Sequence, residues 1–205
     1  MTIATDSVTT PSGRTLEGLK PGVWTVDTSH SEVGFTARHL MVSKVRGRFT
    51  DYSATVTVAP NVLDSTVEAV VQLESVETRD EKRDAHLKSA DFFHVEEHPT
   101  MSFTSTGIRE HGSDFYLDGD LTIRGTTRPV TFDLEFNGVA TTPWGGRSAG
   151  FSAETEINRK DWGLEWNVAL ESGGVLVSEK VKIALEIEAL APQVESTETA
   201  EATQA

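Results

Sequence analysis

The chain has 205 residues, with 18 lysines and arginines against 32 aspartates and glutamates, a formal net charge of −14. The length suits one domain with tails. The acidic balance argues against nucleic-acid binding, which needs a basic patch, and against adsorption to anionic lipid headgroups. With no cysteine, the chain has no disulfides, thiolate metal sites or cysteine nucleophiles. No run approaches the roughly 18 to 20 apolar residues of a membrane span, so we expect no stable membrane insertion.

Both ends of the chain are predicted to be disordered. Residues 1–20 lack the apolar core of about 7 to 15 residues that marks a secretory signal, which predicts a cytoplasmic location. Residues 191–205 contain three glutamates, no basic residue and no aromatic residue. Such acidic segments bury too little apolar area to offset the entropy lost on ordering. A single domain is therefore expected over residues 21–190.

Apolar residues alternate with polar ones along most of this domain, as in strands with one buried and one solvated face. Residues 80–89 are the exception, because they are helix formers without a β-branched run. We expect an all-β antiparallel fold with one short helix; closure into a barrel is favoured because it removes the edge strands, although a sandwich would give the same periodicity. The alternating segments are, in chain order, residues 23–28, 33–37, 54–58, 67–73, 101–106, 115–123, 130–136, 151–157 and 181–187.

Two polar clusters suggest chemistry. Asp27, Ser29, His30 and Ser31 offer an acid, a base and a nucleophile. In an extended strand, however, His30 would point away from the other three, so a catalytic triad is not expected and a cluster that secures a turn is favoured.

The second cluster, residues 94–98, reads His-Val-Glu-Glu-His, an inverted zincin pattern that works only on a helix. Pro99 disfavours helical geometry at His98. On a strand, His94 and His98 would lie about 13 Å apart, too far to share one ion. We therefore expect no metal site.

Several ordered motifs resemble the signature of the YceI-like polyisoprenoid-binding family. They follow one another in the family's order and extend over about residues 22 to 190. The matching segments are Trp24 to Asp27 with His30 and Ser31, Arg83 to Phe93 with His98 to Phe103, Gly119 to Val130, and Asn158 to Gly163. Trp162 stands where the family usually has Phe.

This resemblance implies a lipocalin-like antiparallel β-barrel of about eight strands. Its interior would hold a polyisoprenoid, such as an isoprenoid quinone, or a similar amphiphilic lipid that the protein carries, stores or senses. No enzymatic activity, catalytic residue or other cofactor is expected. The inward-facing residues expected to line an apolar pocket are Phe35, Phe49, Leu87, Phe92, Phe93, Met101, Phe103, Leu121, Phe132, Leu134, Phe151 and Trp162.

Within such a barrel, the helix near residues 80–89 is expected to plug or gate one mouth together with Phe92 and Phe93. The segment 124–129 is interpreted as a structural hairpin, and Asn158 with Arg159 as a loop anchor. Two alternatives stay open: a packed β-domain whose surface or acidic tail binds a protein partner, and an enzyme acting on a lipid-like substrate. The head group, the chain length and the oligomeric state, including a homodimer, are also open.

Overall fold

The structure, a computed structural model, describes residues 7–143, 145–170 and 174–192. Most of this chain is strand, with one α-helix and three short 3-10 helices. The strands are β1 (Val8–Thr9), β2 (Thr15–Leu16), β3 (Gly22–Val26), β4 (Glu32–His39), β5 (Ser43–Phe49), β6 (Tyr52–Val58), β7 (Thr66–Gln72), β8 (Val76–Glu77), β9 (Thr100–His111), β10 (Asp114–Ile123), β11 (Thr126–Thr141), β12 (Arg147–Asn158) and β13 (Val177–Leu190). The helices are η1 (Val62–Asp64), η2 (Leu73–Ser75), α1 (Glu81–Lys88) and η3 (Arg159–Trp162).

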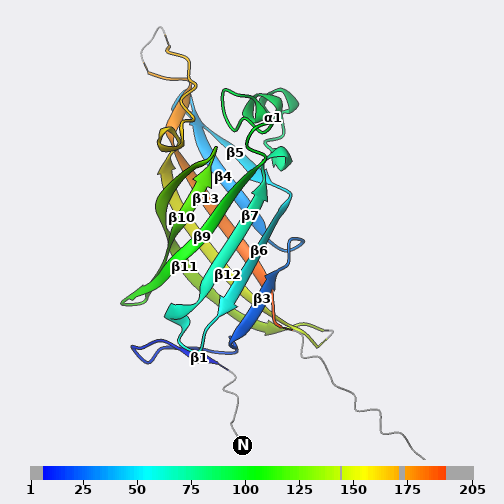
Figure 1. The fold of residues 1–205 in the computed structure, drawn as a ribbon, viewed down its shortest axis with the longest axis vertical. Coiled ribbons are helices and arrows are strands. Elements are labelled where there is room, and N and C mark those ends of the chain that lie inside the picture. Colours follow the sequence, from blue (N-terminus) through cyan, green and yellow to red (C-terminus); the bar gives the residue numbers. More distant parts are fainter. Residues whose placement is uncertain (1–6, 144, 171–173, 193–205) are drawn as a thin grey trace, which may run out of the picture.

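Eight strands close into an antiparallel barrel (Figure 1). The order around it is β12, β11, β10, β9, β7, β6, β3 and β13, and pairing of β13 with β12 completes the ring. β13 changes partner along its length: Ala189 and Leu190 pair with β3, whereas its earlier residues pair with β4. β5 and β8 extend the sheet beyond β4. The prediction of an antiparallel all-β barrel is confirmed.

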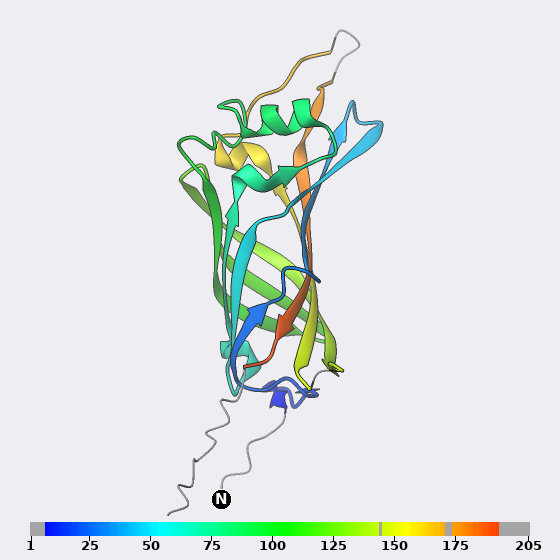
Figure 2. The same cartoon turned by 90° about the vertical axis from the view of Figure 1, so that its right-hand side faces the viewer.

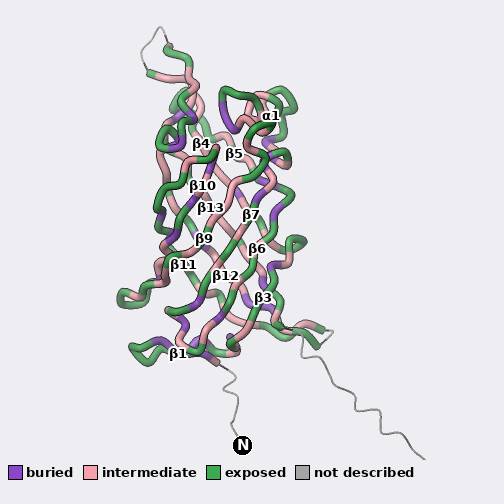
Figure 3. Tube along the Cα trace, in the orientation of Figure 1, coloured by how far each residue is buried: buried purple, intermediate pink, exposed green. Residues whose placement is uncertain are grey.

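The alternation in sequence becomes an alternation in burial along the barrel wall (Figure 3). In β10, for example, Phe115, Leu117, Leu121 and Ile123 are all buried. Gly119, in the same strand, gives the ring of Phe103 room to lie across it, because a Cβ at this position would lie 2.3 Å from Phe103 Cζ. One wall residue is thus small so that a neighbouring aromatic side chain fits.

One end of the barrel, which we call the lid end, carries α1, η3 and the β4–β5 hairpin (Figure 2). The side chain of Asp80 accepts hydrogen bonds from the backbone N–H groups of Lys82 and Arg83, which fixes the start of α1. The helix therefore forms where its composition predicted it. Within the described residues, no helix is long and apolar enough to cross a membrane.

The other end, the base end, is covered by residues 7–21 (Figure 2). The prediction that residues 1–20 are disordered is wrong for the described part, residues 7–20. Val8, Leu16 and Leu19 are each at most 4% exposed and pack beside Trp24 in one cluster. Three well-spaced apolar residues are enough because the barrel supplies the rest of the core. Residues 1–6 and 193–205, also predicted to be disordered, lie outside the described residues.

Candidate binding cavity

The barrel encloses a cavity of about 180 Å³ in its middle and toward the base end. Its walls come from the inward faces of β3, β4, β6, β7, β9, β10, β11, β12 and β13, and Leu16 and Leu19 contribute from the segment before β3. Nearly all wall residues are aliphatic or aromatic. An apolar space of this size stays dry and accepts an apolar guest, as an engineered cavity of about 150 Å³ does.

A second cavity, of about 120 Å³, lies under the lid end. Leu87 of α1, together with Phe92 and Phe93 in the loop that follows it, forms part of its wall. Val33, Met101 and Ile183 line both cavities and separate them. The two spaces therefore follow one another through the barrel interior.

An aromatic cluster covers the smaller cavity. The ring of His86 meets Trp166 edge to face at a centroid distance of 4.6 Å and Phe92 at 5.1 Å. His86 Nε2 also lies 2.8 Å from Asp91 Oδ2. α1 itself has no buried residue. The prediction that this helix, with Phe92 and Phe93, lies at one mouth is confirmed in placement; gating stays a prediction.

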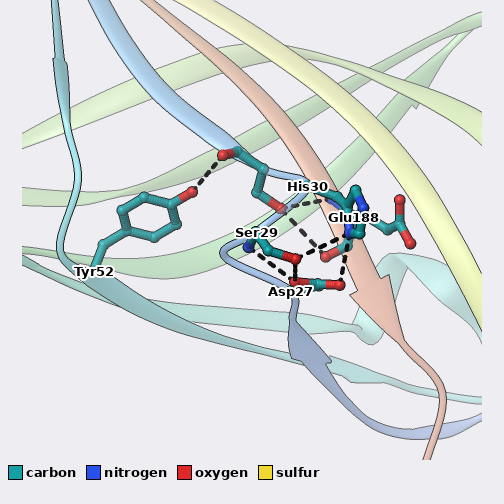
Figure 4. A network of polar contacts seen from close by, with 6 residues as sticks. Asp27, Ser29, His30, Tyr52 and Glu188 are labelled. Atoms are coloured by element: carbon teal, nitrogen blue, oxygen red, sulfur yellow. Dashed lines mark hydrogen bonds and ion pairs between the residues drawn. The ribbon is translucent and has the colours of Figure 1, made fainter.

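Few polar groups reach the cavity walls. Tyr52 lines the larger cavity, but its hydroxyl donates to the backbone oxygen of Ser31 at 2.7 Å (Figure 4). The other polar residues in the described part of this wall are three serines, Ser53, Ser65 and Ser102. Among the described residues, the wall of the larger cavity thus has no carboxylate, lysine, arginine or histidine.

Arg159 is the one charged residue among the described wall residues of the smaller cavity, and it is 4% exposed. Its Nε donates to the backbone oxygen of Ser178 at 3.0 Å, and its Nη1 donates to that of Leu164. Its Nη2 is buried with no hydrogen-bond partner. Burial lowers the pKa of Arg159, and Glu179 partly opposes that shift. The guanidinium thus anchors η3 and keeps one donor unused beside the cavity.

All twelve residues predicted from inward parity lie on a cavity wall. Six line the larger cavity, including the shared Met101, and the others line the smaller one. Contact with a ligand stays a prediction. The predicted set is mostly aromatic and lacks many aliphatic wall residues, although the same alternation marks them. Among the omitted residues are Val26, Val33, Ala54, Val56, Val67, Val71, Leu117, Ile183, Leu185 and Ile187.

The basic residues of the other motifs serve the lid end. Arg124 Nη1 donates to the backbone oxygen of Gly163, and Arg128 Nε to that of Asp161, both at 3.2 Å. The side chain of Asn158 accepts from Lys160 N at 3.1 Å and begins η3. Segment 124–129 is thus a structural hairpin, and Asn158 and Arg159 anchor a loop, as predicted.

The Asp27 cluster converges, contrary to the predicted strand geometry, because β3 ends at Val26 and the chain turns (Figure 4). His30 Nδ1 lies 2.9 Å from Asp27 Oδ2 and 3.1 Å from Ser29 Oγ. A triad needs the acid and the serine on different ring nitrogens, whereas both approach Nδ1 here. Hydrogen bonds from Ser29 and His30 hold the pKa of Asp27 at about 2. The cluster secures a turn.

The predicted separation of His94 and His98 is also wrong. His94 has a left-handed φ of 53°, and the backbone N–H of His98 donates to its oxygen at 2.9 Å, so the chain turns instead of extending. The ligand atoms of His94, Glu97 and His98 all lie within 4.8 Å of one another. Asp27, His30 and Glu188 form a second such group. The distance argument against a metal therefore fails for His94 and His98.

Comparisons with known proteins agree with this architecture. A UPF0312 protein of Staphylococcus epidermidis is 40% identical over 158 residues, which cover 76% of this chain and 90% of that protein. A Campylobacter jejuni YceI protein of known structure is 29% identical, with a TM-score of 0.65, over 76% of this chain and 90% of that one. A polyisoprenoid binding domain from Saccharophagus degradans shares the fold, with a TM-score of 0.64 at 18% identity, over 82% and 98% of the two chains.

The model of the YceI-like domain matches residues 24–189, from the first long barrel strand to the end of the last. That range includes all twelve predicted wall residues and both arginines that join the β10–β11 hairpin to η3. The chain belongs to the YceI-like domain family.

Proposed function

We propose that the protein binds a long apolar lipid chain, of the polyisoprenoid kind, along the barrel interior and shields it from water. The observation that carries this proposal is the pair of consecutive apolar cavities, which extend from the floor formed by Leu16 and Leu19 to the cover formed by Leu87 and Phe92. The proposal is also supported by the similar fold of the Saccharophagus degradans domain, which is described as polyisoprenoid binding.

The energetics of an unfilled interior support the same ligand. At about 24 cal/mol per Å³ of cavity, the larger space of 180 Å³ costs the folded state roughly 4 kcal/mol. A methylene group moved from water into such a space gains about 0.8 kcal/mol, so each five-carbon unit of a polyisoprenoid contributes roughly 3 to 4 kcal/mol. A packed domain that only binds proteins would gain nothing from keeping this space.

The polar end of the ligand is expected at the lid end. The unused Nη2 of Arg159 beside the smaller cavity would donate to a quinone, carboxylate or phosphate oxygen. The turn formed by Asp27, Ser29 and His30 lacks triad geometry, which supports binding without catalysis. A carrier, storage or sensing role, a cytoplasmic location and an isoprenoid quinone as the cargo stay predictions.

The test is native mass spectrometry of protein purified without detergent, followed by solvent extraction. A stoichiometric adduct that extracts as an isoprenoid lipid is expected. An apo mass that is unchanged after addition of prenyl alcohols or isoprenoid quinones would refute the proposal.

A matched pair of variants localises the ligand. Ala69 lies on the wall of the larger cavity, whereas Val70, the next residue of β7, is 40% exposed on the outside. Ala69→Phe fills the space and is expected to reduce lipid binding at least tenfold; Val70→Phe adds a ring outside and is expected to leave it unchanged. Equal binding by a folded Ala69→Phe variant would show that the chain does not occupy this cavity.

A further inference from the structure

The β4–β5 hairpin ends in a projecting apolar tip. Leu40, Met41 and Val42 are 38%, 54% and 82% exposed. Val168, which is 45% exposed, lies in a neighbouring loop. Leu176 links this loop to the hairpin, because Leu40 N donates to Leu176 O and Leu176 N donates to Val168 O. Four of the seven large exposed apolar residues in the described chain thus belong to this tip and the loop bonded to it.

The tip uses residues that its turn does not favour. Leu40 and Met41 have left-handed φ values of 51° and 59°, and Val42 N donates to His39 O across this two-residue turn. Such a turn favours Asn-Gly or Asp-Gly, since large L side chains are strained at positive φ. Two large apolar residues in strained and exposed positions contribute little to folding, which points to a role in contact with something outside the chain.

The stem of the same hairpin is basic. Between Val33 and Thr50 the sequence has four cations and no carboxylate. The register places Arg38 opposite Lys44, and Arg46 and Arg48 follow along the outward face, all of them exposed. Arg48 pairs with Glu77, whereas no carboxylate of the described residues lies within ion-pair distance of the other three. Like charges directly opposite each other destabilise a strand pair, so folding does not explain them.

The inner face of the hairpin belongs to the smaller cavity. Phe35 and Ala37, which alternate with the outward cations, are wall residues there. The outside of β4 and β5 therefore carries positive charge, the tip carries apolar side chains, and the inside borders the space expected to hold a lipid chain.

We propose that the β4–β5 hairpin docks the lid end of the barrel onto an anionic lipid bilayer, with Leu40, Met41 and Val42 in the interfacial layer and Arg38, Lys44 and Arg46 against the headgroups. Apolar side chains next to unpaired cations are what interfacial binding uses. On a chain of net charge −14, the remaining surface is repelled, so docking is oriented. The net charge of −14 argues against adsorption of the surface as a whole to anionic headgroups, whereas the hairpin is locally positive.

Docking does not require a lipid bound in the barrel, but the benefit of docking rests on the proposed function. It would bring the smaller cavity next to the bilayer, where a lipid chain can enter or leave without crossing water. A protein partner fits less well, because a stable protein interface takes about 800 Å² from each side and the tip is a narrow projection.

The experiment is co-flotation of the full chain with phosphatidylcholine vesicles that contain or lack phosphatidylglycerol. Binding is expected only with the anionic lipid and is expected to weaken with added salt. Each cation near the surface contributes about 1 kcal/mol, so Lys44→Gln with Arg46→Gln should weaken binding at least tenfold. Lys180→Gln with Lys182→Gln changes the net charge equally on exposed residues of β13 and should not.

The apolar tip has its own control. Met41→Asp with Val42→Asp is expected to abolish flotation, whereas Val23→Asp, at a 52% exposed position in β3, is expected to keep it. Equal loss in the test and control variants, or no flotation of the parent protein, would overturn the proposal; the latter would leave the hairpin to a protein partner. Native mass spectrometry of the parent protein without vesicles separates the two proposals. A parent protein that floats but carries no lipid adduct would count against the cavity and not against docking, whereas one that carries the adduct but does not float would overturn docking alone.

Discussion

The two ends of the barrel are closed in different ways. At the base end Trp24, Leu19 and Val8 are among the four largest fully buried side chains of the described chain. At the lid end α1 has no buried residue, and a cavity lies beneath its cover. The base is closed by densely packed side chains, whereas the helix at the lid end contributes no buried side chain to the cover of the smaller cavity. Elements with few buried contacts open most easily, so lipid exchange is expected at the lid.

Removal of one indole from each end should show the largest contrast. Trp24 is fully buried and its Nε1 donates to Lys20 O at 2.9 Å, so Trp24→Ala is expected to lower the free energy of unfolding by roughly 3 to 5 kcal/mol. Trp166 is only half-buried in the lid cluster, and Trp166→Ala should cost less than half as much. Urea unfolding measures both. Equal losses would show that the two ends are equally well packed.

The attachment of the lid tests the next largest effect. Arg159→Met removes two hydrogen bonds from a buried guanidinium to backbone oxygens and is expected to cost roughly 2 to 4 kcal/mol. Arg124→Met removes one bond from a half-buried arginine to the same loop and should cost about 1 kcal/mol or less. Thermal unfolding compares them. A more stable Arg159→Met variant would mean that the unpaired donor outweighs the two bonds.

A single methyl group tests the wall between the two ends. At Gly119 a new Cβ would lie 2.3 Å from the Phe103 ring, so Gly119→Ala is expected to displace that ring and cost roughly 1 to 3 kcal/mol. Gly107, in the adjacent strand β9, has no atom within 4 Å of an added Cβ, so Gly107→Ala serves as the control and should be close to neutral. A neutral Gly119→Ala variant would show that the wall there yields easily.

The same contrast explains what the sequence could predict. Long strands such as β10 and β11 repeat their pattern often enough to show which face is buried, so the barrel and the predicted wall residues that lie on strands follow from it. Leu87, Phe92, Phe93 and Trp162 lie outside the strands, so alternation does not account for them. The base segment could not be predicted in this way, because Val8, Leu16 and Leu19 have no period and pack only against a barrel that is already formed.

The predictions for two short polar segments are wrong for a related reason. The strand geometry predicted for residues 27–31 and 94–98 is wrong, because each segment contains a turn. The left-handed φ of His94 has no sequence signal, since the residue is not glycine. The cavity volumes also had no sequence signal, since aromatic residues that line a space and aromatic residues that fill it show the same alternation.

The smallest effect on stability is expected at the turn between β3 and β4, which contains Asp27 and His30. A hydrogen bond to Asp27 raises the pKa of His30 above its ordinary value of 6.5, and Glu188 adds a weaker effect. Because the pKa of His30 is raised, His30 stabilises the fold below pH 6.5, and this contribution is lost as the pH rises through the folded-state pKa. Because the pKa of Asp27 is lowered, Asp27 stabilises the fold above pH 3.8, and this contribution is lost as the pH falls toward about 2. Histidine titration by NMR is expected to show a large fall in the His30 pKa in Asp27→Asn and a small fall in Glu188→Gln. Equal shifts would mean that the general field of the acidic surface, and not this hydrogen bond, sets the His30 pKa.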